Sequence, residues 1–339
     1  MTNARRTDLS VIYNNIKLTE ELGDDLVDWT YTDNLSGEID DLQLVVQDAM
    51  VKWLNDWFPS KGSLLNVEHL RKHWNKSVLK TKLGKFEVDE LSGQSGGTRM
   101  TIKALSVPES TSIRGEHKSK AWEKATLKQV AGDIAKVNKL KLHWQSSDNP
   151  KKDRYEQESE TDLAFLHRLC KDEGLCLKLS NKSIVILDEA DYEAKPVVDT
   201  IYRRSKDTCK IQLLDWSFKT TLTGTYKDCR VQSHAASKKK TIKATFAPPK
   251  APKVGRTLIV KDEVKSVAEA YKLAKKRLRD ANKNATTVNL VVISEIHIDA
   301  GMTFTLSEFG RLNGKYIVTK VIHNKSKITL DLRKCLEGY

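Results

Sequence analysis

The sequence predicts a β-rich α+β protein in which two similar β-barrel domains flank a mixed α+β domain. Three observations support this prediction: an internal repeat, strand-type periodicity in both copies, and helix-type periodicity between them. Copies far apart in the sequence indicate duplicated domains rather than a solenoid. We expect a first barrel over 1–107, a middle domain over 108–196, a second barrel over 197–232 and 288–339, and an inserted basic helical segment over 233–287.

The repeat consists of two pairs of similar segments. Residues 26–39 read LVDWTYTDNLSGEI and residues 213–226 read LLDWSFKTTLTGTY, an offset of 187. Residues 84–91 (GKFEVDEL) and 314–321 (GKYIVTKV) form the second pair, at an offset of 230. The second copy therefore carries 43 more residues between these landmarks than the first, which predicts an insertion.

The first copy alternates apolar and polar residues. Residues 8–48 have period two and many Val, Ile, Leu, Trp and Tyr, which predicts a strand meander. Residues 49–59 end at a proline and are expected to form a short helix or a loop over the sheet. Strands resume over 77–91 and 99–107, so a small barrel or sandwich is expected.

The middle region contains two helix-then-strand units. Thr126 is an N-cap residue before apolar positions at helical spacing. Ser159, with Asp162 three residues later, resembles a capping box, and Gly174 is expected to end that helix. The strands 175–179 and 184–187 should form a hairpin.

The insertion, placed between Val231 and Val288, is strongly basic. Between Lys238 and Lys283 there are 15 Lys and Arg residues against four Asp and Glu, in a chain of net charge +13. Residues 266–282 form an amphipathic pattern that predicts a helix docked on the middle domain. A nucleic-acid groove needs clustered cations, but the segment's two aromatic residues supply a poor stacking platform. A solvated face or a docking patch for an acidic protein partner is preferred, and nucleic acid is not an expected partner.

Composition excludes other classes. The 339 residues are 39% apolar and 30% charged, as in folded soluble proteins. There is no run of eighteen apolar residues, and residues 1–10 lack the apolar core of a signal peptide, so we expect no membrane partner and a protein that works from the cytoplasm. The cysteines are odd in number and irregularly spaced, and reduced core residues are expected: Cys170, Cys176, Cys209, Cys229 and Cys335.

Few residues suggest chemistry. His69 and His73 stand four apart, a spacing that can bind zinc on a helix, but a polar setting without a third ligand favours two exposed histidines. Trp29 and Trp216 occupy matched positions and are expected in the cores, so Trp216→Ala should cost about 3–5 kcal/mol. We assign no catalytic residue, cofactor or metal site, and expect no enzyme activity.

A group of carboxylates is the remaining candidate. It comprises Glu156, Glu158, Glu160 and Asp162. Paired carboxylates can act as acid and base when their environments separate their pKa values. Here they more simply favour the positive end of a helix dipole.

Three stretches resemble a known family. Residues 155–169 (YEQESETDLAFLHRL), continuing through 173–186, resemble the hallmark of phage late control protein D and of the N-terminal half of VgrG proteins. Residues 84–89 and 106–127 resemble the end of that family's first domain and its junction with the next. Residues 301–323, with GMTFTL and GKYIV, resemble the closing barrel.

The resemblance implies a structural baseplate hub of a phage tail or phage-tail-like contractile particle. It implies two tube-type barrels per chain and a homotrimer, so that three chains present six near-identical units to a sixfold tail tube and a threefold face to the spike. Partners would be the tail tube or tube-initiator protein and the central spike protein, with baseplate wedge and tape-measure proteins as further candidates. The protein would be assembled in the host bacterial cytoplasm and reside in the tail baseplate.

Two alternatives belong to other functional classes. A LysM-like pattern over 126–142 suggests peptidoglycan binding as one alternative. The cluster of carboxylates suggests a cell-wall hydrolase, which would lose activity in Glu158→Gln or Glu160→Gln. The basic insertion suggests DNA binding as a further alternative, with an affinity that would fall steeply as salt concentration rises. The chain departs from VgrG by stopping at Tyr339, so spike and hydrolase are expected on separate chains.

Overall fold

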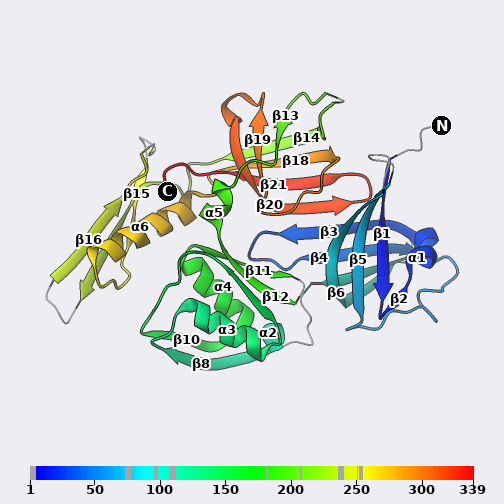
Figure 1. The fold of residues 1–339 in the computed structure, drawn as a ribbon, viewed down its shortest axis with the longest axis horizontal. Helices are drawn as coiled ribbons and strands as arrows, with labels where there is room; N and C mark the ends of the chain where they lie inside the picture. The colour runs from blue at the N-terminus through cyan, green and yellow to red at the C-terminus, as the bar shows by residue number, and fades with distance from the viewer. Residues whose placement is uncertain are drawn as a thin grey trace.

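The structure, a computed structural model, consists of four packed parts that are mostly β (Figure 1). The first copy of the repeat lies at one end and the second copy beside it. The middle domain lies alongside both, and the insertion lies at the end opposite the first copy. The described residues are 5–72, 78–94, 98–106, 112–180, 182–206, 208–235, 240–249, 251 and 255–339.

The first copy is a sheet with a buried apolar face. Its elements are β1 (Arg6–Tyr13), β2 (Ile16–Lys17), α1 (Thr19–Asp25), β3 (Leu26–Asn34), β4 (Asp41–Gln47), β5 (Leu64–Lys72), β6 (Leu79–Gln94) and β7 (Arg99–Leu105). Alternating residues of β4 and β7 are buried, as the period-two pattern predicts. Residues 49–57 form turns and bends that bring Trp53 into this core.

The middle domain has two helices packed on short sheets. Its elements are α2 (Ser112–Gly115), β8 (His117–Glu123), α3 (Leu127–Val137), β9 (Lys141–Gln145), β10 (Arg154–Thr161), α4 (Asp162–Asp172), β11 (Leu175–Ser180), β12 (Ser183–Asp188) and α5 (Glu189–Ala194). Thr126 caps α3 in a capping box with Gln129. Thr161 caps α4, whereas Ser159 was expected to; Ser159 instead lies in an irregularity of β10 with φ 48°.

The second copy repeats the order of the first. Its elements are β13 (Asp199–Tyr202), β14 (Ile211–Thr220), β18 (Thr286–Ser294), β19 (Thr303–Ser307), the 3₁₀ turn Gly310–Leu312, β20 (Gly314–Asn324) and β21 (Ile328–Lys334). Neighbouring strands follow the order β3-β4-β7-β6-β5 in the first copy and β14-β18-β21-β20-β19 in the second. The duplication inferred from sequence is therefore a duplication of topology.

The insertion lies between β14 and β18 and has its own core. It comprises β15 (Tyr226–Ala235), β16 (Lys240–Phe246), β17 (Arg256–Val260) and α6 (Val267–Asn282). Ser266 caps α6, whose buried Ala270, Ala274 and Leu278 belong to a cluster with residues of β15 and β16. Because β15 pairs with β16 and β17, residues 226–232 lie in the insertion's sheet, although they were expected in the second barrel.

The two copies share one sheet, whereas two separate barrels were expected. Thirteen strands are hydrogen-bonded into a single sheet because β20 of the second copy pairs antiparallel with β3 of the first. Within the ranges described above, neither copy closes on itself. None of the helices in those ranges is long and apolar enough to span a membrane.

Candidate assembly surfaces

Local backbone irregularities are duplicated along with the strands. The register of β3 with β4 shifts between Leu26 and Asp28, and that of β14 with β18 shifts at the matching positions 213 and 215. The Asp28 carboxylate accepts a hydrogen bond from its neighbour's backbone N–H at 2.8 Å, and Asp215 does the same at 2.8 Å. A β-bulge bends a strand and increases its twist, so both copies curve in the same way.

The second pair of bulges lies on β6 and on its counterpart in the second copy, β20. The pairing of β6 with β7 shifts between Val88 and Glu90, and that of β20 with β21 shifts between Val318 and Lys320. These positions differ by the repeat's offset of 230. The repeat therefore preserves the geometry of each strand.

The seam between the copies is a short antiparallel ladder of β3 and β20. Residues 320–324 pair with residues 34–30 in antiparallel order. Tyr31 stacks on His323 with ring centroids 5.9 Å apart and an interplanar angle of 19°. Beyond the ladder, the N–H of Leu35 donates to Thr319 O at 2.9 Å. Backbone hydrogen bonds and a buried aromatic pair thus join the two copies.

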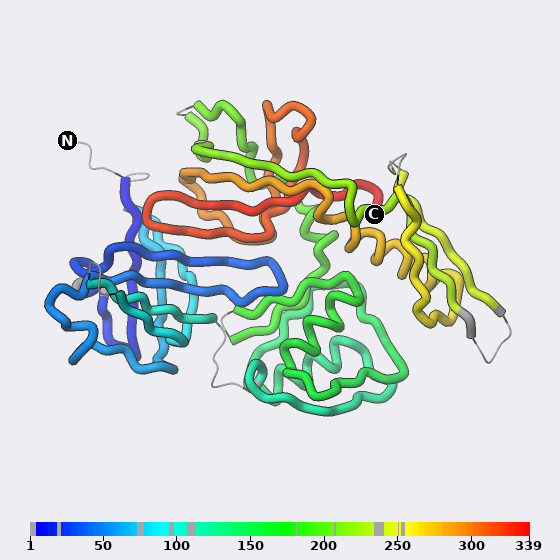
Figure 2. Tube along the Cα trace, turned by 180° about the vertical axis from the view of Figure 1, so that it is seen from behind, coloured from blue at the N-terminus to red at the C-terminus, as the bar shows by residue number. Residues whose placement is uncertain are grey.

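The strands that correspond to β3 and β20 of the seam are β14 and β6. Each of them has an edge that is unpaired among the described strands. β14, the counterpart of β3, pairs with β18 alone among the described strands and lies outermost in the row of strands in Figure 2. Its apolar Leu214 and Phe218, and Leu222 just beyond it, are 55%, 52% and 62% exposed. In the part of the chain that is described, residues 90–94 of β6, the counterpart of β20, pair only with β7. Such edges are templates for strand addition.

The matched tryptophans have different environments. Trp29 is 1% exposed and lies in the core of the first copy. Trp216 is only partly buried, where it stacks on Phe218 at 6.0 Å and meets Phe309 edge to face at 5.2 Å. The expectation that Trp216 is a core residue is wrong for the single chain, because β14 has no neighbour on that side among the described strands.

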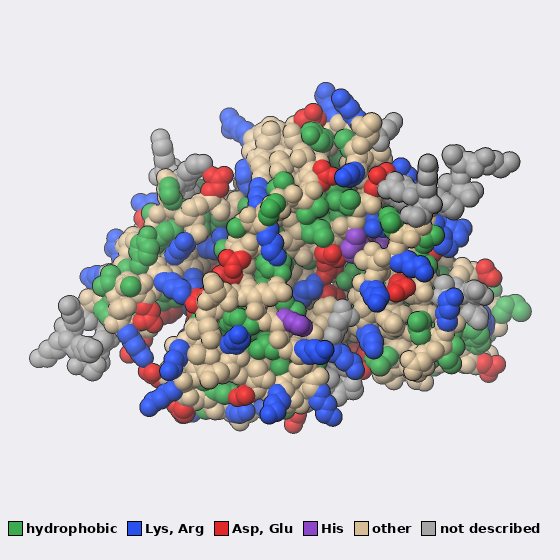
Figure 3. Space-filling view, in the orientation of Figure 1, with side chains coloured by type: hydrophobic (Ala, Val, Ile, Leu, Met, Phe, Trp, Pro, Cys, Tyr) green, Lys and Arg blue, Asp and Glu red, His purple; other side chains and the backbone are tan. Residues whose placement is uncertain are grey.

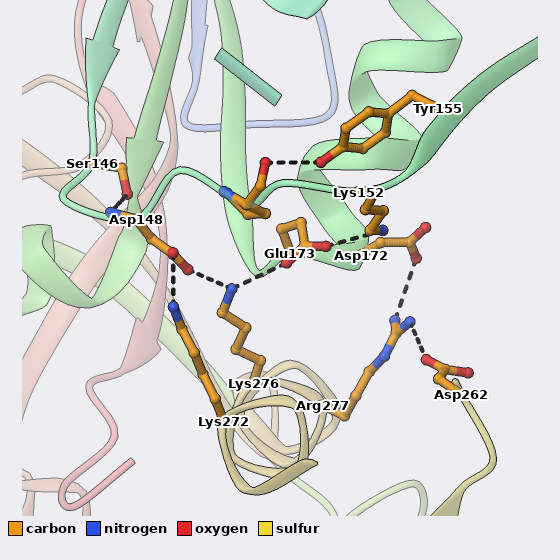
Figure 4. A network of polar contacts seen from close by, with 11 residues as sticks. Ser146, Asp148, Lys152, Tyr155, Asp172, Glu173, Asp262, Lys272, Lys276 and Arg277 are labelled. Carbon is orange, nitrogen blue, oxygen red and sulfur yellow. Dashed lines mark hydrogen bonds and ion pairs between the residues drawn. The ribbon is translucent and has the colours of Figure 1, made fainter. Parts of the chain in front are cut away.

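The basic face of α6 lies against acidic residues of the middle domain (Figure 4). The Lys276 ammonium lies 2.6 Å from the Asp148 carboxylate and 3.2 Å from that of Glu173. Lys272 also contacts Asp148, at 2.7 Å, and Arg277 contacts Asp172 at 3.3 Å. A cleft of about 840 Å³ lies beside these contacts. The helix thus turns its apolar face to its own sheet and its charged face to the middle domain.

These contacts decide how the basic insertion is interpreted. Hydrogen bonds from Lys272 and Lys276 hold the pKa of Asp148 below its ordinary value, although burial acts to raise it. Figure 3 shows Lys and Arg side chains spread over the middle domain as well as the insertion, with Asp and Glu among them. Cations engaged in ion pairs are not free to neutralise phosphates, so the geometry favours a docking role. Residues 236–239, part of the basic segment, lie outside the described residues.

Two buried ionic clusters fix the four parts together. Arg333 of β21, 1% exposed at its side chain, lies 2.7 Å from the Glu189 carboxylate and 2.5 Å from that of Glu193. Arg279 of α6 also contacts Glu193, at 2.6 Å. Burial acts to raise the pKa of Glu189, but the Arg333 charge holds it below its ordinary value. The α5 carboxylates therefore bridge the second copy and the insertion.

The second cluster joins the middle domain to both copies. The Lys178 ammonium contacts the carboxylate of Asp33 and donates to Asn34 O at 2.7 Å. The other Asp33 oxygen accepts from the backbone N–H of Ala300 at 2.7 Å. A buried ion pair specifies a geometry because removing one partner strands the other charge. Asp33, near the end of β3, thus contacts the middle domain through one carboxylate oxygen and the second copy through the other.

The carboxylates considered for catalysis face neighbouring cations. Glu156 lies 2.5 Å from Arg154, and Glu160 pairs with Arg168. Asp162 is buried and accepts from Lys118, Asn138 and Gln157; these hydrogen bonds lower its pKa although burial acts to raise it. Glu156, Glu158 and Glu160 lie in β10, which runs directly into α4, and Asp162 is the first residue of that helix. Glu156, Glu160 and Asp162 are thus held in structural contacts.

The remaining candidates lie in unexpected settings. His69 is in strand β5 and 3% exposed, so the expected helix face and exposed side chain are wrong; His73 lies outside the described residues. Sequence spacing could not identify its neighbours, which come from distant segments. Three of the five cysteines are buried and two partly buried, and all are free thiols: Cys170, Cys176, Cys229, Cys209 and Cys335.

The fold defines a class: a β-rich protein built from a duplicated unit whose joining edges recur elsewhere on the chain, where they are unpaired within the described residues. A family model for the phage tail baseplate hub (GPD) matches residues 87–327. The chain belongs to this family of structural hub proteins, which confirms the resemblance to phage late control protein D.

Individual relatives are consistent with this assignment. The probable baseplate hub protein of Escherichia phage P2 is 29% identical over 168 residues, which are 49% of this chain and 41% of that protein. The fold matches a 43 kDa tail protein of prophage MuSo2 from Shewanella oneidensis at TM-score 0.70 and 13% identity, covering 96% of this chain and 98% of that one. It also matches the E. coli c3393 protein, a type VI secretion component, at TM-score 0.57 and 11% identity, covering 93% and 75%.

Proposed function

We propose that three copies of this chain form a ring that joins the sixfold tail tube to the threefold spike in the baseplate of a phage tail or related contractile particle. The duplicated unit carries this proposal. Three chains with two equivalent units each present six similar units to a tube protein, while the insertion and the middle domain occur once per chain and give the other face threefold symmetry.

The seam within the chain predicts the contact between chains. In the seam, residues 320–324 of β20 pair with residues 34–30 of β3. The repeat offsets of 230 and 187 convert these into residues 90–94 of β6 and residues 221–217, which are the end of β14 and the residue after it. The ring therefore forms when the open edge of β14 pairs with the open edge of β6 in the next chain.

This contact is heterologous, so it must close to avoid a filament. Six such contacts close a ring when each one rotates the next unit by about 60° without a rise along the axis, and two units per chain make that ring a trimer. The exposed Leu214, Phe218 and Leu222 of the β14 edge supply apolar surface of the kind that interfaces bury. Pairing also removes two strand edges that would otherwise favour aggregation.

Solution mass tests the proposal. The purified chain should give a species near three times 38.4 kDa by light scattering, and a candidate spike protein in a second sample should add its own mass to that species. Phe218→Asp should reduce this species to monomer, because a carboxylate would be buried in the strand pair.

The matched control for this variant is Phe58→Asp. Phe58 and Phe218 are each 52% exposed, but Phe58 lies far from both edges in sequence, in the connection from β4 to β5. It should leave the mass unchanged, and both variants should keep the monomer's melting temperature. A monomer in both wild-type samples, or equal effects of the two variants, would refute the ring.

A further inference from the structure

We propose that His69, His297 and His323 form a binding site for one divalent transition metal, of which Zn²⁺ is the best match, at the junction of the two copies. One ring nitrogen of each histidine lies within 4.8 Å of the other two. His69 comes from β5 of the first copy, His323 from β20, and His297 from the connection between β18 and β19. The site goes beyond the proposed hub function and does not depend on it.

The hydrogen bonds of two histidines leave the correct atoms for a metal. Nε2 of His323 lies 2.9 Å from the carbonyl oxygen of Ile298, which can only accept, so Nε2 carries the proton. Nε2 of His297 lies 2.9 Å from the Asp299 carboxylate, which likewise accepts. In a neutral imidazole the other nitrogen, Nδ1, is then an unprotonated lone pair. Metal-ligating histidines have this arrangement, with one nitrogen on the metal and the other donating to a carboxylate or carbonyl.

Four nitrogens of the cluster are buried without a hydrogen-bond partner among the described residues: both nitrogens of His69 and Nδ1 of His297 and His323. His69 and His323 are 3% and 1% exposed. A buried polar atom left unpaired costs on the order of 1–3 kcal/mol, so an occupant that satisfies three of them is strongly favoured.

The donor set suits a borderline transition metal. Three imidazoles are typical ligands of Zn²⁺, with nitrogens about 2.0–2.1 Å from the ion and therefore about 3.3 Å from one another. Because the nitrogens now lie within 4.8 Å of one another, they must approach by at most about 1.5 Å to reach this geometry. Ring centroids are already 5.0 Å apart for His297 and His323 and 5.8 Å apart for His69 and His323.

Charge and access are also consistent with a cation. Arg71 lies nearby and keeps its positive charge, because its guanidinium donates to the backbone carbonyl oxygen of Glu295 at 2.8 Å, whereas the Asp299 carboxylate supplies opposite charge next to His297. The His297 side chain is 15% exposed, so it is the ligand nearest to solvent, and a water there would be the fourth ligand. The bound ion would connect β5 to β20 and so fix the first copy against the second.

The test uses the full-length chain after chelator treatment and dialysis. Calorimetric titration should show one Zn²⁺ per chain, and saturating Zn²⁺ should raise the melting temperature by about 5 °C. Titration with Co²⁺ should give the intense visible absorption of a four-coordinate site, which surface histidines do not produce. His297→Ala is the chosen variant because His297 is the most accessible ligand and its loss is the least disruptive to the core.

His143→Ala provides the matched control, since His143 is an exposed histidine in β9 of the middle domain. We expect His297→Ala to abolish the thermal shift and the cobalt absorption while His143→Ala retains both. Asp299→Asn should weaken binding about tenfold with one site still present. Absence of zinc binding by the wild type, or equal binding by His297→Ala and wild type, would overturn the assignment.

Discussion

Trp29 and Trp216 show how one residue type acquires different roles in two copies of a unit. Each tryptophan follows an aspartate whose carboxylate accepts a hydrogen bond from the tryptophan's backbone N–H at 2.8 Å. Trp29 is enclosed by β1, β5 and β6 residues in its core, whereas Trp216 rests on Phe218 and Phe309 beside an open strand edge. The sequence match alone indicated two equivalent core residues, because it contains no information on which edges are paired.

Truncation of each tryptophan measures this difference. Trp29→Ala should lower the free energy of unfolding of the single chain by about 3–5 kcal/mol, as for a fully buried aromatic side chain. Trp216→Ala should lower it by less than about 2 kcal/mol, because solvent already contacts part of the ring. Urea denaturation at a protein concentration where light scattering shows a monomer gives both values without a contribution from assembly. Equal losses would contradict the environments described above.

At the scale of elements, α6 is a two-faced connector. Its Ala270, Ala274 and Leu278 pack in the insertion's own core, and its Lys272 and Lys276 contact the middle domain. The amphipathic pattern over 266–282 predicted the helix correctly, and its first residue, Ser266, is the N-cap. It did not reveal that the apolar face serves the insertion, because the sequence does not show that β15 to β17 form a sheet there.

Charge reversal at Lys276 tests whether the charged face of α6 holds the insertion against the middle domain. Lys276→Glu would place a carboxylate beside Asp148 and Glu173, and we expect a loss of about 2 kcal/mol in the docking of the insertion, because the Lys276 side chain is only 20% exposed. Limited proteolysis should then cut the connections at 221–225 and 283–285 faster. Lys275 is an exposed neighbour, and Lys275→Glu makes the same change of charge. The protease should cut this variant at the wild-type rate. Similar rates for both variants would show that the ion pairs do not hold the insertion.

Predictability also differs among elements. The strand meander, the capped helix α3 and the hairpin of β11 and β12 follow from periodicity and cap residues close in sequence. The ladder of β3 with β20 joins residues almost 300 positions apart, and the histidine cluster draws on three distant segments. Such contacts are fixed by the packing of whole domains, so local pattern could not predict them.

At the scale of the whole molecule, the two copies form one open sheet with two unpaired strand edges that correspond to the seam between the copies. The β3–β20 seam uses one edge from each copy, and the corresponding edges on β14 and β6 remain for a neighbour. The ionic clusters around Arg333 and Lys178 fix the angle between the copies by connecting them to the middle domain. A fixed angle is what allows identical contacts to close into a ring rather than a filament.

The most direct test is a disulfide across the proposed contact between chains. The repeat offsets place Ser92 of one chain opposite Lys219 of the next, and both side chains are exposed. Under mild oxidation, with the spike protein present, Ser92→Cys combined with Lys219→Cys should give a covalent trimer on non-reducing gels. Ser92→Cys combined with Asp215→Cys, four residues or roughly 13 Å out of register, should not, because a disulfide needs Cα atoms within about 7 Å. A monomer from the first pair, or equal cross-linking by both pairs, would contradict the ring.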